Sequence, residues 1–351
     1  MISLVSTVFN DREGIESFIG SMLRQTLLPD EIVIVDAGSR DGTWEFLQQE
    51  AERLDRSWKF RTFQEIRCNV ARGRNLAIQL ASGDLIASTD IGCDWDPEWL
   101  EELARPLLDQ PAVELVSGSW AVRKGDLHGP WALTEWALKG EQRFVASAEC
   151  HPSSRSVSYR KSVWQGLGGY PEDLTLAGDD AVFDFLIEKA SITRTGAPLI
   201  RCYWHRHGTL KAFLKESWRY GLGDGEAMIR KKDVFLIGGR LLLEPALLLL
   251  GILLLVIGGR GGAMTGLLLA LAGVASFSLR IPRMVPASVR LSRQGVRFAF
   301  ARILLFSHGT KIFWLRGYVT GLFHGFRQCG TCRRRLRLMS PVRYREAKGS
   351  I

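Results

Sequence analysis

The sequence predicts an α/β fold, a mainly parallel sheet with helices on both faces, followed by helices that enter a membrane. The first observation is a repeated order of short apolar strands and amphipathic helices in the first hundred residues. The second is a pair of apolar segments, 241–259 and 263–279, each about long enough to cross a bilayer. The third is an Arg-rich segment directly after them.

The strands of the first hundred residues differ from the helices in periodicity. Ile32–Val35 has no polar alternation, which is typical of a parallel strand buried on both faces. Residues 13–24 instead carry apolar side chains at helical spacing. The other expected elements are strands at 2–8, 58–63, 84–89 and 192–203, and helices at 44–54, 70–80 and from Asp179.

Asp36 follows the 32–35 strand and precedes the loop Ala-Gly-Ser-Arg-Asp-Gly-Thr. Ligands of open α/β sheets bind just beyond the carboxyl ends of strands, so Asp36 lies where a nucleotide would bind. An ordinary polar turn has the same composition, because Asp, Gly and Ser are common in turns. For Asp36 alone both interpretations stay open.

Several segments, in order, resemble family 2 glycosyltransferases, which have a GT-A fold. They are VSTVFNDREGIESFIGSMLRQTLLPDEI, EIVIVDAGSRDGT, ARGRNLAIQLASGDLIASTDIGCDWDPEWLEEL, GYPEDLTLAGDDAVFDFLI and, more weakly, SWRYGLGDGEA. Together they cover roughly the first two thirds of the chain. The resemblance implies a Rossmann-like GT-A domain over residues 1–206 that uses a nucleotide-sugar donor.

The resemblance also implies a set of donor-binding residues. They are Thr7, Val8, Asp36, Arg74, Asn75 and Thr89. The Asp36 carboxylate would accept hydrogen bonds from an imide N–H of uracil or a ribose hydroxyl. Arg74 and Asn75 match the family's Arg-Asn pair near the diphosphate or base, and Arg72 is a nearby alternative. A UDP-sugar is favoured and a GDP-sugar is possible.

The metal position departs from the family pattern. The family's Asp-x-Asp binds a divalent cation, whereas here Gly92 replaces the second Asp after Asp90. One carboxylate, phosphate oxygens and waters can still hold Mg²⁺ or Mn²⁺, so Asp90 is the predicted ligand. Asp96 before Pro97 and Glu98 is favoured as the start of a helix. Further candidate ligands, which could equally be exposed side chains, are Asp94, Asp96, His205 and His207.

Asp179 and Asp180 begin a helix-like run and match an acidic pair of the family. The resemblance implies that Asp180 is the catalytic base for the acceptor hydroxyl, with Asp179 as its neighbour and a possible acceptor contact. Acids at this position also suit a helix N-terminus. Adjacent carboxylates raise each other's pKa, which favours a base.

Charge is unevenly distributed along the chain, and this distribution predicts the topology of the chain in a membrane. The net charge is +9, yet the residues from Arg280 onward include 16 Lys and Arg and one acid, Glu346. The basic part directly follows the apolar pair, so anionic lipids are favoured as partners over nucleic acid. The positive-inside rule, with two crossings, places the catalytic domain and C-terminus in the cytoplasm at the inner (plasma) membrane. The expected segments are an amphipathic interfacial stretch at 207–236, a transmembrane hairpin at 237–280, membrane-surface helices at 281–328 and a basic cytoplasmic tail at 329–351.

These observations predict a membrane-anchored, inverting glycosyltransferase of multi-pass topology with a lipid-linked or envelope-glycan acceptor. No signal peptide is expected, because a strand begins at Ile2. The six scattered cysteines fit a reducing cytoplasm, and Cys329 and Cys332 lack a second pair for a metal site. Two alternatives stay open: a non-catalytic membrane scaffold, which Gly92 favours, and a nucleotidyltransferase, whose Gly-rich loop the segment VFNDREG matches poorly.

Overall fold

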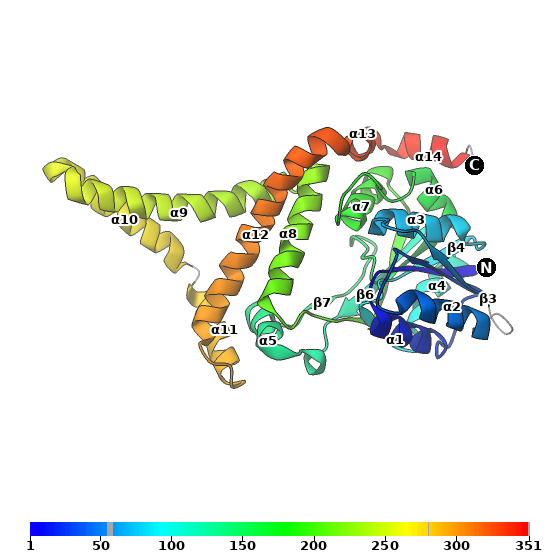
Figure 1. Ribbon diagram of the computed structural model, residues 1–351. Helices are drawn as coiled ribbons and strands as arrows, with labels where there is room; N and C mark the ends of the chain where they lie inside the picture. The colour runs from blue at the N-terminus through cyan, green and yellow to red at the C-terminus, as the bar shows by residue number, and fades with distance from the viewer. Residues whose placement is uncertain (55–58, 280, 350–351) are drawn as a thin grey trace. The chain divides into compact units, whose positions relative to one another are not determined.

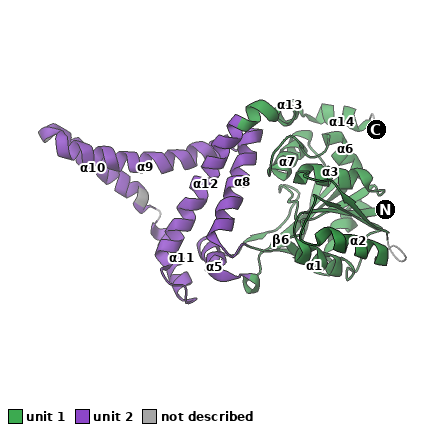
Figure 2. Ribbon diagram, in the orientation of Figure 1, with its two compact units in different colours: residues 1–126, 141–206, 324–351 green, residues 127–140, 207–323 purple. Residues whose placement is uncertain are grey.

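The computed structural model describes residues 1–54, 59–279 and 281–349. Two compact units divide them, coloured green and purple in Figure 2. Unit 1 comprises residues 1–126, 141–206 and 324–351, and unit 2 comprises residues 127–140 and 207–323. The chain therefore leaves unit 1 twice and returns to it at its C-terminal end.

A mixed sheet forms the centre of unit 1 (Figure 1). Its strand order is β3-β2-β1-β4-β8-β6-β9-β5, with β7 paired to β6. β3, β2, β1 and β4 are parallel; β8 runs antiparallel to β4 and to β6, β9 is parallel to β6, and β5 is antiparallel to β9. The strands are β1 (Ile2–Val8), β2 (Glu31–Asp36), β3 (Lys59–Gln64), β4 (Leu85–Ser88), β5 (Cys93–Trp95), β6 (Leu115–Ala121), β7 (Arg143–Phe144), β8 (Val157–Arg160) and β9 (Arg194–Trp204).

Helices cover both faces of this sheet. Leu4, Ile32 and Ile34 share one core cluster with residues of α1, α2 and α4, whereas α3 lies over the opposite face (Figure 1). The alternation of a strand's side chains between faces explains this division. The helices are α1 (Arg12–Met22), α2 (Thr43–Leu54), α3 (Val70–Leu80), α4 (Trp99–Asp109), α6 (Lys161–Leu167) and α7 (Asp179–Ala190), with a 3-10 turn η1 (Lys124–Asp126).

The predicted α/β class is confirmed, but the sheet is mixed rather than mainly parallel. The parallel β-α repeat holds only through β4. Of the later strands, β8 pairs antiparallel with β4 and β6, β7 with β6, and β5 with β9, whereas β9 is parallel to β6. Trp58, the expected start of the third strand, lies outside the described residues.

The expected helix start at Asp96 is wrong. α4 begins at Trp99, after Glu98, which makes no capping hydrogen bond through its side chain. The Asp96 carboxylate instead accepts hydrogen bonds from Arg123 Nη2 and Tyr203 Oη, each at 3.0 Å. It therefore joins neighbouring strand ends rather than capping a helix.

The expected basic tail is folded. α13 (Gly330–Leu338) and α14 (Pro341–Gly349) belong to unit 1. Cys332 N donates to Asp173 Oδ2 at 2.9 Å, and Tyr344 Oη donates to Glu114 Oε1 at 2.9 Å. Positive charge alone predicted a basic cytoplasmic tail, and the buried side chains of Cys332 and Tyr344 attach this segment to unit 1.

Unit 2 contains α5 (Gly129–Lys139), α8 (Leu210–Ala227), α9 (Lys231–Ile257), α10 (Gly259–Ser278), α11 (Ile281–Ser292) and α12 (Ala299–Gln328), whose last residues pass into unit 1. The glycines of the 221–225 segment lie within continuous α8. They let α8 and α12 approach closely, because a methyl group at any of four glycines would overlap the backbone of the other helix. The pairs are Gly221 with Trp314, Gly225 with Tyr318, Gly317 with Trp218, and Gly321 with Leu222.

α9 and α10 form an antiparallel hairpin that is also packed through glycine. A methyl group at Gly251 would lie 2.5 Å from Ala270 N, and one at Gly273 would lie 3.1 Å from Glu244 O. Among the described residues, α9 is the one helix long and apolar enough to cross a membrane by itself. The bent pair 261–276 and 281–292, with a 44° break, meets the same criterion jointly. The second crossing of the expected hairpin thus remains a prediction.

Candidate functional site

The carboxyl end of β2 presents Asp36, which is fully buried. Asp36 Oδ1 accepts hydrogen bonds from Gly38 N, Ser39 N and Gln64 Nε2, each at 2.9 Å. Within the described residues, the buried Oδ2 has no hydrogen-bond partner. One oxygen therefore shapes the loop, while the other is an acceptor that a ligand's donor can satisfy.

The loop after Asp36 needs glycine at two positions. Gly38 and Gly42 have φ values of 91° and 89°, which side chains rarely adopt. Asp41 closes the loop by accepting from Thr43 Oγ1 at 2.6 Å, and this bond, the largest influence, holds the pKa of Asp41 below its ordinary value. The Gly-Ser-x-Asp-Gly-Thr pattern thus fixes a turn and places backbone N–H groups around Asp36.

Arg74 of α3 joins two acidic positions from other elements. Its guanidinium donates to Asp90 Oδ1 at 3.0 Å and makes a short hydrogen bond to Asp179 Oδ2. It also lies 4.8 Å from the centre of the Tyr170 ring. Arg74 is buried, and its pKa is raised, because the neighbouring acids, Asp179 first, outweigh desolvation. The site therefore holds a permanent cation between two carboxylates.

The acidic pair at the start of α7 has two different environments. Asp179 is buried against Arg74, and burial raises its pKa to about 6, despite the opposing effect of Arg74. Asp180 is only half-buried, and its one hydrogen bond in the described structure comes from Ala181 N at 2.8 Å. Asp179 is thus occupied by the cation, whereas Asp180 remains available.

Asn75 was expected to contact the donor, but its amide is used within the protein. Its Nδ2 donates to Tyr170 O at 2.9 Å and Glu172 Oε1 at 2.8 Å, and its Oδ1 accepts from Trp164 Nε1 and Tyr170 N, each at 2.8 Å. An amide offers two donors and two acceptor positions, so all four are filled. Asn75 thus holds the turn that carries Tyr170, and its contact with the donor stays a prediction.

The other predicted donor residues lie near the ends of β1 and β4. Thr89 is buried, donates to Arg155 O at 2.6 Å and accepts from Trp95 Nε1 at 2.9 Å, so its hydroxyl is also largely occupied. Val8 is paired with Asp36 in the sheet, and Thr7 with Val35. The Thr7 side chain faces α3, where a methyl group at Gly73 would lie 3.0 Å from its Cγ2.

Few side chains are placed to coordinate a metal ion. Asp90 lies just beyond β4 with its side chain 42% exposed. Within residues 1–54, 59–279 and 281–349, no three His, Cys, Asp or Glu side chains form a group that could hold a metal. The residues therefore fit a cation held by one carboxylate together with ligand oxygens and water, not an all-protein cage. A Cβ at Gly92 would meet nothing within 4 Å, so a side chain can begin there without overlap.

The two candidate histidines have separate partners. His205 Nε2 lies 2.9 Å from Asp94 Oδ2, and His205 N donates to Gly92 O at 3.1 Å. These contacts bring His205 beside the Asp90–Asp94 segment of unit 1. His207 belongs to unit 2, where its Nε2 lies 3.5 Å from Glu216 Oε1.

Two residues of the site were not anticipated from the sequence. Gln64 ends β3 opposite Asp36, and that parallel register could have identified it. Tyr170, stacked on Phe183 with ring centres 4.2 Å apart, supports Arg74 from the loop before α7. Tyr170 lies inside the motif that resembles the family, but nothing local indicates which cation it contacts.

Comparison with known proteins identifies the domain. Residues 3–163 match the profile of Glycosyl transferase family 2, and this range contains Asp36, Arg74 and Asp90. The chain carries a family 2 glycosyltransferase domain. The described structure matches that of the mannosyltransferase PcManGT from Pyrobaculum calidifontis, solved with GDP-Man and Mn²⁺, with a TM-score of 0.55, 17% identity, and coverage of 92% of this chain and 87% of that one. This likeness establishes a fold of the GT-A type.

Two curated relatives of the family 2 domain come from Haloferax volcanii. The glycosyltransferase AglE is 26% identical over 182 residues, 51% of this chain and 58% of AglE. The glucosyl-dolichyl phosphate glucuronosyltransferase is 25% identical over 185 residues, 48% of this chain and 56% of that protein. The chain therefore matches a little more than half the length of each relative.

The pKa of Asp179 predicts how stability depends on pH. Between its ordinary value of 3.8 and about 6, the folded chain keeps a proton that the unfolded chain has released. The free energy of unfolding should therefore fall as pH rises from about 4 to 6, and Asp179→Asn should remove that part of the slope. Urea unfolding at several pH values measures it, with exposed Asp109→Asn as the control. An identical slope in wild type and Asp179→Asn would show that Asp179 does not titrate in this range.

Proposed function

We propose that the chain transfers a sugar from a nucleotide-sugar donor to an acceptor hydroxyl, with inversion at the anomeric carbon. The arrangement of Arg74 between Asp90 and Asp179 carries this proposal, since it sets a buried cation and two carboxylates just beyond β4, at the same edge of the parallel strands as Asp36 at the end of β2. The family 2 match over residues 3–163 supports the same reaction class.

The donor's nucleoside would lie at Asp36. Its Oδ2 accepts an imide N–H or a ribose hydroxyl, while Oδ1 keeps the loop in place. Thr7 and Val8 border this position at the end of β1. A UDP-sugar is favoured and a GDP-sugar is the alternative.

The diphosphate would lie at Asp90, beside Arg74. Mg²⁺ or Mn²⁺, when bound there, supplies positive charge for the leaving diphosphate. Asp90 would be its protein ligand. Arg74 orients Asp90 through their 3.0 Å hydrogen bond and adds its own positive charge to the same region.

Asp180 would act as the general base. It takes the proton of the acceptor hydroxyl as that oxygen bonds to the anomeric carbon and the bond to the diphosphate breaks, the electron pair leaving with the nucleoside diphosphate. Its half-buried side chain without a cationic partner among the described residues supports this role over Asp179, which Arg74 engages.

The acceptor would be lipid-linked or an envelope glycan, and the protein would be anchored in the inner (plasma) membrane. α9 has the length and apolarity to cross a bilayer, and α10 packed against it would form the second crossing. The relative from Haloferax volcanii that is named for dolichyl phosphate supports an acceptor of this class. The positive-inside rule then places the catalytic domain in the cytoplasm.

The first test concerns the nucleoside. Asp36→Asn keeps an oxygen for the loop but replaces the buried acceptor with a donor. The free energy of binding UDP or GDP should become less favourable by about 1–3 kcal/mol, the cost of an unsatisfied buried hydrogen-bonding partner. Calorimetry on the full chain measures it, with Asp109→Asn as the matched control. Unchanged affinity for both nucleotides would remove Asp36 from the donor site.

The second test concerns the base. Asp180→Asn keeps the size of the side chain but cannot take a proton, so turnover should fall about 10²–10⁴-fold while donor binding survives. Labelled nucleotide sugars incubated with the protein and a membrane extract report turnover. Near-normal turnover of the Asp180→Asn variant would indicate that Asp179 is the general base instead. Absence of transfer and of donor hydrolysis by the wild type with every nucleotide sugar would favour a non-catalytic scaffold.

The third test concerns the metal. Gly92→Asp restores a second carboxylate in open space, so half-maximal activity should need less Mg²⁺ or Mn²⁺ than in the wild type. Asp90→Ala should need more, and Gly92→Ala is the control for the added side chain. The measurement is activity against metal concentration. Full wild-type activity in excess chelator would rule out the metal role of Asp90.

A further inference from the structure

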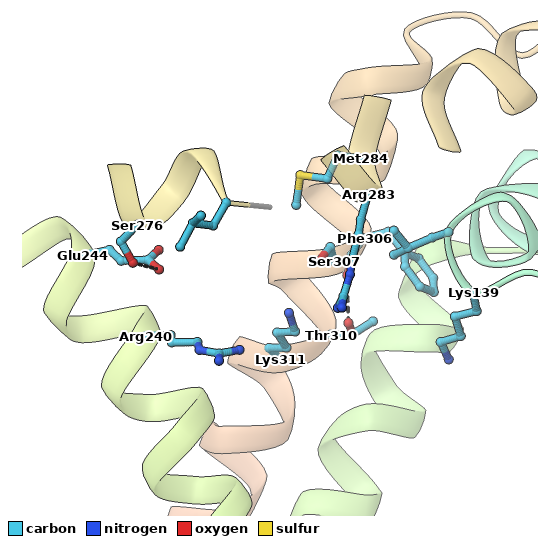
Figure 3. Close-up of a pocket in the computed structure, with 12 residues that line it drawn as sticks. Lys139, Arg240, Glu244, Ser276, Arg283, Met284, Phe306, Ser307, Thr310 and Lys311 are labelled. Carbon is cyan, nitrogen blue, oxygen red and sulfur yellow. Dashed lines mark hydrogen bonds between the residues drawn. The ribbon is translucent and has the colours of Figure 1, made fainter. Parts of the chain in front are cut away.

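Unit 2 contains a pocket of about 520 Å³ where five helices meet (Figure 3). α5, α9, α10, α11 and α12 all contribute to its lining. Its polar side chains are Lys139, Arg240, Glu244, Ser276, Arg283, Ser307, Thr310 and Lys311. The predicted catalytic residues belong to unit 1, so this pocket is built from different elements.

Positive charge dominates the pocket. The head groups of Arg240, Arg283 and Lys311 come from three different helices and point toward one another (Figure 3). Within the described part of the chain, neither Arg240 nor Arg283 makes a hydrogen bond or ion pair through its side chain. Like charges that converge in this way repel, and an anion between them would relieve the repulsion.

The cations of the lining outnumber its acids, and Lys311 and Glu244 each have a further interaction within the protein. Glu244 is the one acid of the lining, and it accepts a hydrogen bond from Ser276 Oγ at 2.9 Å (Figure 3). Lys139, at the edge, pairs with Glu135 at 2.7 Å. Arg240, Arg283 and Lys311 thus outnumber the one lining carboxylate, and the pocket retains a positive charge suited to an anionic ligand.

The pocket lies at the base of the apolar hairpin. Arg240 immediately precedes the run from Leu241, in which Leu242 is 73% exposed and Val256 is 77% exposed. Ser276 and Leu279 lie near the residue where α10 ends. The start of α9 and the end of α10 therefore line the pocket together, at the open end of the hairpin. If the hairpin is in a bilayer, this end is level with the lipid headgroups, where Arg side chains meet phosphates.

We propose that this pocket binds the phosphate group of a membrane lipid. Guanidinium groups match phosphate oxygens with paired hydrogen bonds, and the exposed leucines beside the pocket would contact the acyl or prenyl chain. The proposal rests on the membrane anchoring in the proposed function, but not on sugar transfer or on the roles of Asp36, Asp90 and Asp180.

The test uses the full chain in micelles of an uncharged detergent, titrated with short-chain phosphatidic acid. Arg240→Ala/Arg283→Ala should weaken binding at least about tenfold, the effect of losing charge-assisted contacts. Arg297→Ala/Arg316→Ala removes the same charge from exposed positions outside the pocket and should bind like the wild type. Arg240→Lys/Arg283→Lys should restore part of the affinity.

Three outcomes would overturn the proposal. Equal affinity of the wild type and Arg240→Ala/Arg283→Ala would exclude the pocket. An equal loss in both alanine pairs would indicate general electrostatic attraction. Displacement of the lipid by inorganic phosphate at equal concentration would show that the lipid chain contributes nothing.

A matched variant separates this proposal from the proposed reaction. Asp180→Asn should bind the lipid like the wild type even though its sugar transfer falls. Conversely, donor hydrolysis in the absence of lipid should be unchanged in Arg240→Ala/Arg283→Ala. Failure of lipid binding would therefore leave the evidence for sugar transfer intact.

Discussion

The burial of one guanidinium organises the catalytic half of the molecule. Arg74 is removed from water inside unit 1, and a buried cation is tolerated only with nearby negative charge and satisfied hydrogen bonds. Asp90 and Asp179 provide both, from the end of β4 and the start of α7. The next residue, Asn75, anchors the Tyr170 turn through a filled set of hydrogen bonds. α3 thereby holds the two acidic segments in fixed relation, and Asp180 is placed by the same contacts that secure its neighbour.

Much of this half could be predicted from local pattern. Apolar runs predicted the bounds of β1 and β2 closely, and helical periodicity predicted α3. The position of Asp36 at the end of a strand could also be predicted without long-range information. The functions of Asn75 and Thr89 could not be predicted in this way. Their partners, such as Trp164 for Asn75 and Arg155 for Thr89, are distant in the sequence, and only the folded chain shows that their polar atoms are already used. A motif identifies a position, whereas the hydrogen-bond count decides whether the side chain remains free for a ligand.

Unit 2 shows the opposite problem: its composition was informative, but the roles of its single residues could not be predicted. The apolar runs predicted α9 and α10, but nothing in the local sequence indicated why Gly221 and Gly225 lie inside a continuous α8. Glycine weakens an isolated helix, but it permits a close helix–helix contact when the partner backbone fills the space. Gly317 and Gly321 on α12 are the matching half of this contact, about a hundred residues away. Charge likewise described the C-terminal segment without revealing that Tyr344 and Cys332 bury it.

The return of α13 and α14 to unit 1 has a consequence for how the protein is made. Synthesis proceeds from the N-terminus, so Glu114 can accept its hydrogen bonds from Tyr344 and Lys348 only after the whole of unit 2 has been translated. Unit 1 is therefore completed last, after the apolar helices α9 and α10 have been synthesised. A chain shortened within those helices would lose part of unit 1 as well. Isolating unit 1 would instead require joining residue 126 to residue 141 and residue 206 to residue 324.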